Sequence, residues 1–468
     1  MALTKAHNRM IADATINVKD YGAVGDGVTD DSAAIQAAIA AGNRIFFPKP
    51  AVAYYIGSTI TVPGNRSLIG EATQSDSKTI LAARGAPAIW VQGSVVDIEG
   101  INIEFDKTTL SDFTNTADVG IRVRDVAAAS PTSPSAWPYL TQINIQNVNI
   151  NKAYTSIDMD AVFWVNVEDC HLYRDFYSLR INRNQHDAHG GGSIPRVATT
   201  VKIDRVYCHG TVTQYSVPSG SLAFDITGTQ VLEMSHCVTE NLDTAANLYT
   251  ITSGVLRNFY AENIEAGFRV FGALSPFIVE QPFITKGTGS LPYCFRVSDG
   301  NMTFIGGSIT MGGGGDAFYS PEPANANANA TFLKLPVINS CVMYSTATTK
   351  LTGGLDSDGD IVLGTNDADY KTLLARDGFG VFTSGVAKTL AEPHKNAGLY
   401  LVYGYSLTGS GLWLVMARTS AGATVISTDN ATGGTVAFGV DGTNHLTITS
   451  TGTSSQVLQD ARIITLMR

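Results

Sequence analysis

Apolar residues recur through the middle of the chain in one short pattern: apolar, any, apolar, two others, apolar, any, apolar. Successive copies lie 22 to 25 residues apart where no insertion separates them, as from Ile145 to Val167 and from Val279 to Phe304. Alternation of apolar and polar residues is typical of a strand with one buried face. The two-residue step in the middle reverses the alternation, which a bend between two short strands requires. One clear copy is formed by Val96, Ile98, Ile101 and Ile103.

A repeat of this length is about one coil of a solenoid built from short strands. One coil cannot bury its inner face alone, so coils must stack on one another. Stacked coils pair in parallel, and parallel connections are right-handed by default. A β-sandwich is the alternative, but the Asn-Gly and Asp-Gly hairpin turns that it needs are rare between these segments. The pattern therefore predicts an all-β protein with a right-handed parallel β-helix.

The N-terminal segment predicts a cap for this β-helix. A turn rich in Gly and Asp precedes a helix, in which Asp30 or Asp31 can accept bonds from the first N–H groups. Ile35, Ala38 and Ile39 form its apolar stripe. We expect Gly42 to end the helix in a left-handed conformation, followed by a strand over residues 44–47. The three acidic residues of this turn are better explained as caps than as a metal or phosphate site.

The chain divides by composition into four predicted parts. Residues 1–15 are a short lead or adaptor peptide, residues 16–50 the cap, and residues 51–350 the β-helix. Residues 356–468 are rich in Gly, Thr and Ser, with separate short strands near 399–405, 412–417, 423–427, 436–440 and 446–449. This composition and the separate short strands predict a C-terminal antiparallel, sandwich-like β domain.

Composition narrows the partners. Only 15% of residues are charged and the formal net charge is −10, which disfavours nucleic acid and anionic membranes. The five cysteines are widely spaced, without the patterns of a disulfide framework or zinc site, and we expect them to be small buried side chains. There is no apolar leader and no run of eighteen apolar residues, so we expect neither a signal peptide nor membrane insertion. No cofactor and no metal are expected.

Residues 16–81 resemble the opening of the pectate-lyase-like superfamily. The motifs that carry the resemblance are NVKDYGAVGDGVTDDSAAIQAAI, then RIFFPKPAVAYYIGSTITV, then SLIGE and TIL. The lead LTKAHNRMI and the C-terminal GLYLVYGYSLTGSGLWLVMA further resemble bacteriophage tailspikes within that superfamily.

The resemblance implies a homotrimer in the phage virion, attached through its N-terminus to the tail, baseplate or another fibre. It also implies that the protein binds or depolymerises capsule, exopolysaccharide or lipopolysaccharide at the bacterial surface. A non-catalytic receptor-binding spike and a cellular pectate-lyase-like enzyme are the alternatives at this level. The C-terminal domain is expected to serve trimerisation or accessory carbohydrate binding.

The repeat register predicts two columns of outward residues. The first column contains Tyr173, His209, Glu240 and Glu262, so Glu240 and Glu262 should lie one coil apart. Adjacent strands are about 4.8 Å apart, close to the carboxylate spacing of a retaining glycosidase, and a diagonal pair could reach the wider spacing of an inverting one. Asp243 and Glu265 each follow three residues later and join the candidate catalytic group.

Two further candidates stay open. The second column pairs Glu168 with Asp204, which is the second choice for a carboxylate pair. A polysaccharide lyase would instead need a base and a positive group that neutralises a uronic acid carboxylate, and Tyr173, His209 and Arg174 form such a set. The candidate substrate-binding residues are Trp164, Tyr177, His171 and Arg257.

Overall fold

A computed structural model describes most of residues 15–467. Structure is not described for 1–14, 72–77, 108–112, 126–137, 185–195, 211–218, 272, 287–292, 298–299, 312–315, 320–327, 335–336, 340–341, 344–386, 390–396, 407–408, 419–421, 431–434, 441–445, 452–459 and 468. The predicted adaptor peptide therefore lies almost wholly outside the described residues. The chain divides into two compact units, Met1–Ile361 and Val362–Arg468.

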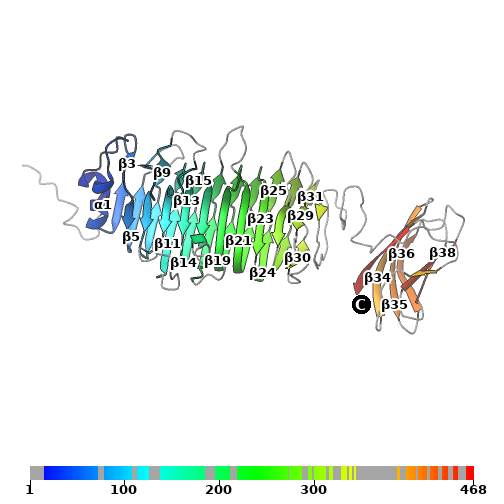
Figure 1. Ribbon diagram of the computed structural model, residues 1–468. Coiled ribbons are helices and arrows are strands. Elements are labelled where there is room, and N and C mark those ends of the chain that lie inside the picture. The colour runs from blue at the N-terminus through cyan, green and yellow to red at the C-terminus, as the bar shows by residue number, and fades with distance from the viewer. Residues whose placement is uncertain are drawn as a thin grey trace, which may run out of the picture. The chain divides into compact units, whose positions relative to one another are not determined.

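The first unit is a right-handed parallel β-helix with three faces, and successive strands visit the faces in turn (Figure 1). Face 1 contains β4 (Ile60–Val62), β7 (Ile89–Val91), β10 (Val119–Val123), β13 (Thr155–Met159), β16 (Tyr177–Ile181), the first parts of β19 (Leu222–Ser235) and β21 (Thr244–Arg257), β23 (Ala266–Phe271), β26 (Tyr293–Val297), β29 (Asp316–Tyr319) and β32 (Val342–Met343).

Face 2 contains β1 (Ile16–Asn17), β2 (Arg44–Phe47), β5 (Arg66–Gly70), β8 (Val96–Glu99), β11 (Leu140–Gln146), β14 (Val162–Glu168), β17 (Thr199–Asp204), the second parts of β19 and β21, β24 (Ala273–Glu280), β27 (Gly300–Ile305) and β30 (Ala328–Lys334).

Face 3 is made of short strands: β3 (Tyr54–Ile56), β6 (Ile80–Ala82), β9 (Asn102–Phe105), β12 (Asn149–Asn151), β15 (His171–Tyr173), β18 (Tyr207–His209), β20 (Val238–Glu240), β22 (Tyr260–Glu262), β25 (Phe283–Lys286), β28 (Ser308–Met311) and β31 (Val337–Asn339).

The bends between faces 2 and 3 explain the two-residue step in the repeat. Asn147, Asp169, Arg205, His236 and Asn258 occupy this position on successive coils, and each has a φ between 49° and 53°. The left-handed conformation turns the chain between strands, and Asn and Asp tolerate it well. Each residue also donates its N–H to the next coil, as Asp169 does to the Asp204 carbonyl at 3.1 Å. The bend is therefore hydrogen-bonded from coil to coil like the strands.

The apolar positions of the repeat fill the inside of the coils. Phe224, Phe259, Phe268, Phe295 and Phe304 are fully buried and follow one another with ring centroids 4.9–5.8 Å apart. Offset and edge-to-face aromatic pairs of this kind add to the free energy gained by burial. Four cysteines are buried as expected, namely Cys170, Cys208, Cys237 and Cys294, whereas Cys341 lies outside the described residues.

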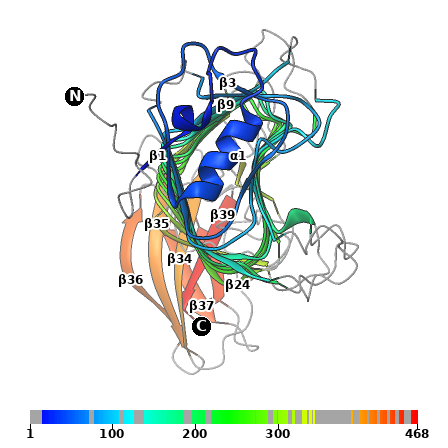
Figure 2. The same ribbon diagram turned by 90° about the vertical axis from the view of Figure 1, so that its left-hand side faces the viewer.

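The N-terminal cap agrees with the prediction except at its end. Helix α1 (Ser32–Ala41) lies across the opening of the first coil (Figure 2), and the short 3-10 helix η2 (Val18–Tyr21) precedes it in the chain. Asp30 accepts a bond from the Ser32 N–H at 2.9 Å, whereas Asp31 binds the N–H groups of Val24 and Gly25 in the preceding turn. The left-handed ending predicted at Gly42 is wrong. Gly42 is extended, with φ −168°, because the chain runs directly into β2.

The second unit contains antiparallel sheets, as the sequence predicts. One sheet contains β33 (Ala387–Thr389), β38 (Leu446–Thr451) and β37 (Thr435–Val440), and the other contains β36 (Gly422–Asn430), β35 (Gly409–Arg418), β34 (Ala397–Ser406) and β39 (Asp460–Met467). Within the described ranges, no helix is long and apolar enough to cross a membrane.

Candidate active site

Three neighbouring strands of face 3 bring the first predicted column together. Strands β18, β20 and β22 pair in parallel, with His209 beside Glu240 and Glu240 beside Glu262. The same register sets Tyr173 beside His209. The predicted placement of these residues is therefore confirmed, while their catalytic role stays a prediction. We call Tyr207, His209, Glu240, Tyr260 and Glu262 the face 3 cluster.

Each of the two carboxylates is held by a tyrosine hydroxyl. The Tyr207 hydroxyl donates to Glu240 Oε2 at 2.7 Å, and the Tyr260 hydroxyl donates to Glu262 Oε2. His209 Nε2 lies 3.7 Å from Glu240 Oε2. The Nδ2 atom of Asn241 lies 3.2 Å from the same His209 nitrogen, which is within hydrogen-bond distance. Both carboxylates are thus oriented by neighbours and remain open to solvent, with Glu240 24% exposed.

The protonation of the neighbours follows from burial and from these bonds. The hydrogen bond to Glu262, followed by burial, raises the pKa of Tyr260 to about 12. Burial and the bond to Glu240 raise the pKa of Tyr207 further. Burial lowers the pKa of His209 below its ordinary value, despite the nearby Glu240 charge. At neutral pH both tyrosines therefore act as donors, and His209 is mostly neutral.

An aromatic row runs beside the carboxylates at the first position of the same strands. The register places His171, Tyr207, Val238, Tyr260 and Phe283 one coil after another. The Tyr260 and Phe283 rings are stacked, with centroids 5.2 Å apart and 3° between planes, and Phe283 is 44% exposed. Exposed stacked rings next to polar groups are suited to the apolar face of a sugar ring.

Asp243 and Glu265 lie around the bend from the face 3 cluster. The Asp243 carboxylate accepts a bond from the Gly220 N–H, and Glu265 accepts one from Lys286 at 2.7 Å. Both carboxylates thus accept hydrogen bonds from nearby donors. Asp243 and Glu265 are also neighbours on adjacent coils, because the Glu265 N–H donates to the Asp243 carbonyl at 3.1 Å. Glu240 and Glu262 are the pair that lies within the paired strands of face 3.

The second carboxylate pair is in register on face 2 but surrounded by cations. Glu168 accepts a hydrogen bond from Lys202, and Arg205 forms an ion pair with Asp204. Burial raises the pKa of Asp204, but bonds from Ser235 and the His236 ring outweigh it, and the pKa lies below its ordinary value. A carboxylate held ionised in this way is poorly suited to be a general acid. We interpret Glu168 and Asp204 as part of a stabilising ion-pair network.

The three residues of the lyase hypothesis also come together. The Arg174 guanidinium lies 5.6 Å from the centre of the Tyr173 ring, and the backbone N–H of Arg174 donates to the His209 carbonyl at 2.8 Å. Besides burial, the Arg174 charge also contributes to lowering the pKa of the His209 imidazole. A neutral imidazole next to a guanidinium is a suitable arrangement for abstracting a proton beside a carboxylate. The lyase alternative therefore keeps geometric support.

The four predicted substrate-binding residues lie on three faces. His171 adjoins the face 3 cluster, with its ring 4.8 Å from that of Tyr207. Tyr177 lines a pocket on face 1. Trp164, which is 55% exposed, and Arg257, which pairs with Glu280 at 2.7 Å, lie on face 2. A single bound sugar chain on face 3 would thus contact His171 but not Trp164.

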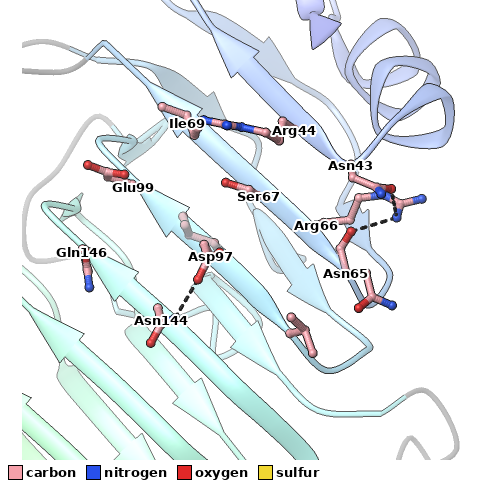
Figure 3. Close-up of a pocket in the computed structure, with 12 residues that line it drawn as sticks. Asn43, Arg44, Asn65, Arg66, Ser67, Ile69, Asp97, Glu99, Asn144 and Gln146 are labelled. Atoms are coloured by element: carbon pink, nitrogen blue, oxygen red, sulfur yellow. Dashed lines mark hydrogen bonds between the residues drawn. The ribbon is translucent and has the colours of Figure 1, made fainter. Parts of the chain in front are cut away.

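A groove that is larger than the face 1 pocket lies on face 2 near the N-terminal cap (Figure 3). Its volume is about 510 Å³, and its lining includes Arg44, Arg66, Asp97 and Glu99. Asn144 donates to Asp97 at 2.7 Å, and Arg66 donates to Asn43 at 2.9 Å. The groove contains none of the predicted catalytic or substrate-binding residues, so we do not take it as the active site.

A buried pair of carboxylates on face 1 is also better explained by structure. The Asn184 amide donates to Asp158 at 3.1 Å and to Asp160 at 2.7 Å. Burial, followed by the Asp158 charge, raises the pKa of Asp160. Asp158 and Asp160 are only 3% and 1% exposed, and they pair with Arg122 and Arg124. Substrate could not reach them in this arrangement.

Tyr207, Tyr260 and Phe283 were not predicted from the sequence. Each stands two residues before the outward column, as in the segment Tyr260-Ala261-Glu262. Because residues i and i+2 of a strand share a face, this spacing was a signal that could have found them. The face 1 arginines Arg180, Arg183 and Arg269 were also not predicted, because Arg269 comes from another coil than Arg180 and Arg183 and no local motif joins them.

The comparisons with known proteins agree with the fold. The family described as Rhamnogalacturonase A/epimerase, pectate lyase-like matches residues 15–269, more than half of the chain. The chain belongs to this pectate-lyase-like family, whose fold includes carbohydrate-active enzymes.

Two individual relatives each match a short segment of the chain. The Shigella phage Sf6 tail spike protein is 39% identical over 74 residues, covering 14% of this chain and 12% of that protein. The Penicillium expansum non-secreted LysM effector LysM19 is 46% identical over 81 residues, covering 14% of this chain and 6% of that protein. The match thus spans a small part of either relative.

Among solved structures, the Acinetobacter phage vb_AbaP_AS12 gp42 tailspike has a TM-score of 0.54 and 11% identity, covering 94% of this chain and 82% of that chain. The β-helix is therefore tailspike-like in fold.

Proposed function

We propose that this protein is a phage tailspike that binds and depolymerises a bacterial surface polysaccharide, such as capsule, exopolysaccharide or O-antigen. The proposal includes a homotrimer in the virion, with residues 1–15 as the docking peptide and the 356–468 domain serving trimerisation or accessory glycan binding. The tailspike-like fold and the pectate-lyase-like family support the class.

The reaction that we propose is glycoside hydrolysis by Glu240 and Glu262. The observation that carries it is the pairing of these two residues in register on adjacent strands. Strands in a sheet are about 4.8 Å apart, near the roughly 5 Å carboxylate separation of retaining glycosidases. One carboxyl would protonate the leaving oxygen, and the other carboxylate would attack the anomeric carbon and form a glycosyl-enzyme ester. Water would then release the sugar, with the first residue now acting as base.

The surroundings of the pair support the assignment. Tyr207 and Tyr260 fix the rotamers of Glu240 and Glu262 through their hydroxyls, which pre-organises the site. The exposed stack of Tyr260 and Phe283 would hold a sugar ring beside Glu262. Neither carboxylate forms an ion pair with Lys or Arg among the described residues, in contrast to Glu168 and Asp204.

A polysaccharide lyase is the second candidate, because His209 is mostly neutral at neutral pH and lies beside Arg174 and Tyr173. Product analysis separates the candidates. A retaining hydrolase leaves new reducing ends with the original anomeric configuration, which proton NMR detects in the first minutes of reaction. A lyase leaves an unsaturated sugar that absorbs ultraviolet light. Binding without either product would identify a receptor-binding spike and overturn the proposed activity.

A further inference from the structure

A second polar cavity lies on face 1, around the bend from the face 3 cluster. Its volume is about 300 Å³, at the lower end of small-molecule sites. Arg180, Asp225, Asn247 and Arg269 occupy one outward column on β16, β19, β21 and β23. We call the cavity the arginine pocket. Its lining residues include Tyr177, Arg180, Arg183, Asp225, Asp243 and Arg269.

Positive charge exceeds negative charge in this lining. Three guanidinium groups face two carboxylates, although the whole chain carries a formal net charge of −10. Arg180 Nε and Arg183 Nε both lie 3.8 Å from the same oxygen of Asp225, so one carboxylate is shared by two arginines. Asp243 accepts a bond from the Gly220 N–H instead. The charged lining of the pocket therefore has a formal excess of one positive charge, in an acidic protein.

The shape and chemistry of the lining suit a charged sugar. A guanidinium presents a planar fork that matches the two oxygens of a carboxylate. The Tyr177 ring lies 4.7 Å from the Arg180 guanidinium, and Thr244 and Asn247 add polar groups that can bond sugar hydroxyls. A small anion would contact only the arginines. A sugar with an anionic group would contact the arginines and also the polar and aromatic side chains of the lining.

The pocket is also next to the proposed catalytic pair along the chain. Asp243 lies three residues after Glu240, and only the bend at Asn241 separates them. A polysaccharide bound at the face 3 cluster could thus extend around this bend into the pocket.

We propose that the arginine pocket binds the anionic group of an acidic sugar in the polysaccharide. The inference rests on the proposed function for its glycan context, and it narrows the substrate to polysaccharides with acidic residues. The carboxylate or phosphate oxygens contact Arg183 and Arg269, and the sugar ring lies against Tyr177.

Calorimetric titration of the full chain with glucuronate, glucose and inorganic phosphate tests this. We expect glucuronate to bind at least tenfold more tightly than glucose and more tightly than phosphate, and 0.5 M NaCl to weaken it. Arg269→Gln should weaken glucuronate binding at least tenfold. Arg269→Lys should weaken it by a smaller factor, because lysine keeps the positive charge but lacks the forked donors of the guanidinium. Arg44→Gln, in the groove on face 2, is the matched control and should bind like the wild type. Thermal unfolding of each variant checks its folding.

Phosphate binding as tight as glucuronate would overturn recognition of the sugar. Three results would overturn the arginine pocket as a site for an anionic sugar. They are equal binding of glucuronate and glucose, no binding of glucuronate, and an unchanged affinity in both Arg269 variants. Glu240→Gln separates the two proposals, because it should lose cleavage and keep glucuronate binding. Failure of the pocket leaves the hydrolase intact, and absence of cleavage leaves the pocket intact.

Discussion

Replacing Asp175 by Asn should make the protein more stable at alkaline pH. Asp175 is fully buried, and its two carboxylate oxygens accept bonds from Ser156 at 2.6 Å and from Ser178 at 3.0 Å. Burial raises its pKa to about 6, although both bonds lower it. Asn has the same shape, and either serine hydroxyl can accept as well as donate. The substitution therefore removes a buried charge at little structural cost.

The size of the effect follows from the pKa. The pKa of the Asp175 carboxyl is about 6 in the folded protein, against an ordinary value of 3.8 that we take for the unfolded chain. The carboxyl therefore contributes stability that is fully present below pH 4 and is lost as the pH rises through 6. The full loss is about 3 kcal/mol, since each pKa unit corresponds to about 1.36 kcal/mol. About half of it falls between pH 5 and pH 8. The Asp175→Asn protein should therefore gain about 1 to 1.5 kcal/mol over wild type between these two pH values.

Urea unfolding of both proteins at pH 5 and pH 8 measures this gain. Other groups titrate in both proteins, so the change in the difference isolates Asp175. Ser178→Ala is the opposing control. It removes a bond that lowers the pKa of Asp175, so it should steepen the loss of stability as the pH rises. An Asp175→Asn protein whose stability differs from wild type by the same amount at both pH values would refute the reasoning.

Four other substitutions test the fold and the site. Phe268→Ala should cost about 3–5 kcal/mol of unfolding free energy in urea, because the ring is fully buried between Phe259 and Phe295; a cost below about 1 kcal/mol would contradict the packing. Gly210→Ala should lower the melting temperature, because a Cβ there would lie 1.7 Å from the Asn241 carbonyl oxygen; an unchanged melting temperature would contradict this close approach. Tyr207→Phe should lower kcat/KM about 10-fold to 100-fold by losing the bond to the Glu240 carboxylate, and full activity would exclude this positioning role. Phe283→Ala should raise KM several-fold with kcat nearly unchanged, because the ring would bind substrate and transition state equally. A several-fold lower kcat with an unchanged KM would exclude stacking of the Phe283 ring on the bound substrate.

The repeat could be predicted from sequence because it is a local periodicity. Inward positions such as Ile145 and Val167 had to be apolar on every coil, and the register then followed from counting. That is why the sequence alone predicts that Glu240 and Glu262 are neighbours. Gly42 was mispredicted because the next strand, rather than local preference, sets its conformation.

The surroundings of the candidate residues were less predictable. Whether a carboxylate is neutralised depends on side chains from other coils, as Lys202 shows for Glu168, 34 residues away. The arginine pocket likewise collects Arg180, Asp225 and Arg269 from three coils, with an insertion between Arg180 and Asp225 and a further coil between Asp225 and Arg269. Aromatic residues were hard to sort because Phe268 is core and Phe283 is exposed, although both occur in short apolar strands.

The most direct test of the central claim is a reducing-end assay on purified surface polysaccharides from a panel of bacteria. It compares the wild type with Glu240→Gln and with Glu168→Gln, a matched carboxylate in register on face 2. The account predicts that one polysaccharide gains reducing ends without ultraviolet absorbance. It also predicts that Glu240→Gln lowers the rate at least about 100-fold, while Glu168→Gln cuts nearly as fast as the wild type. Cleavage that survives in Glu240→Gln and is lost in Glu168→Gln would contradict the assignment of the active site to face 3.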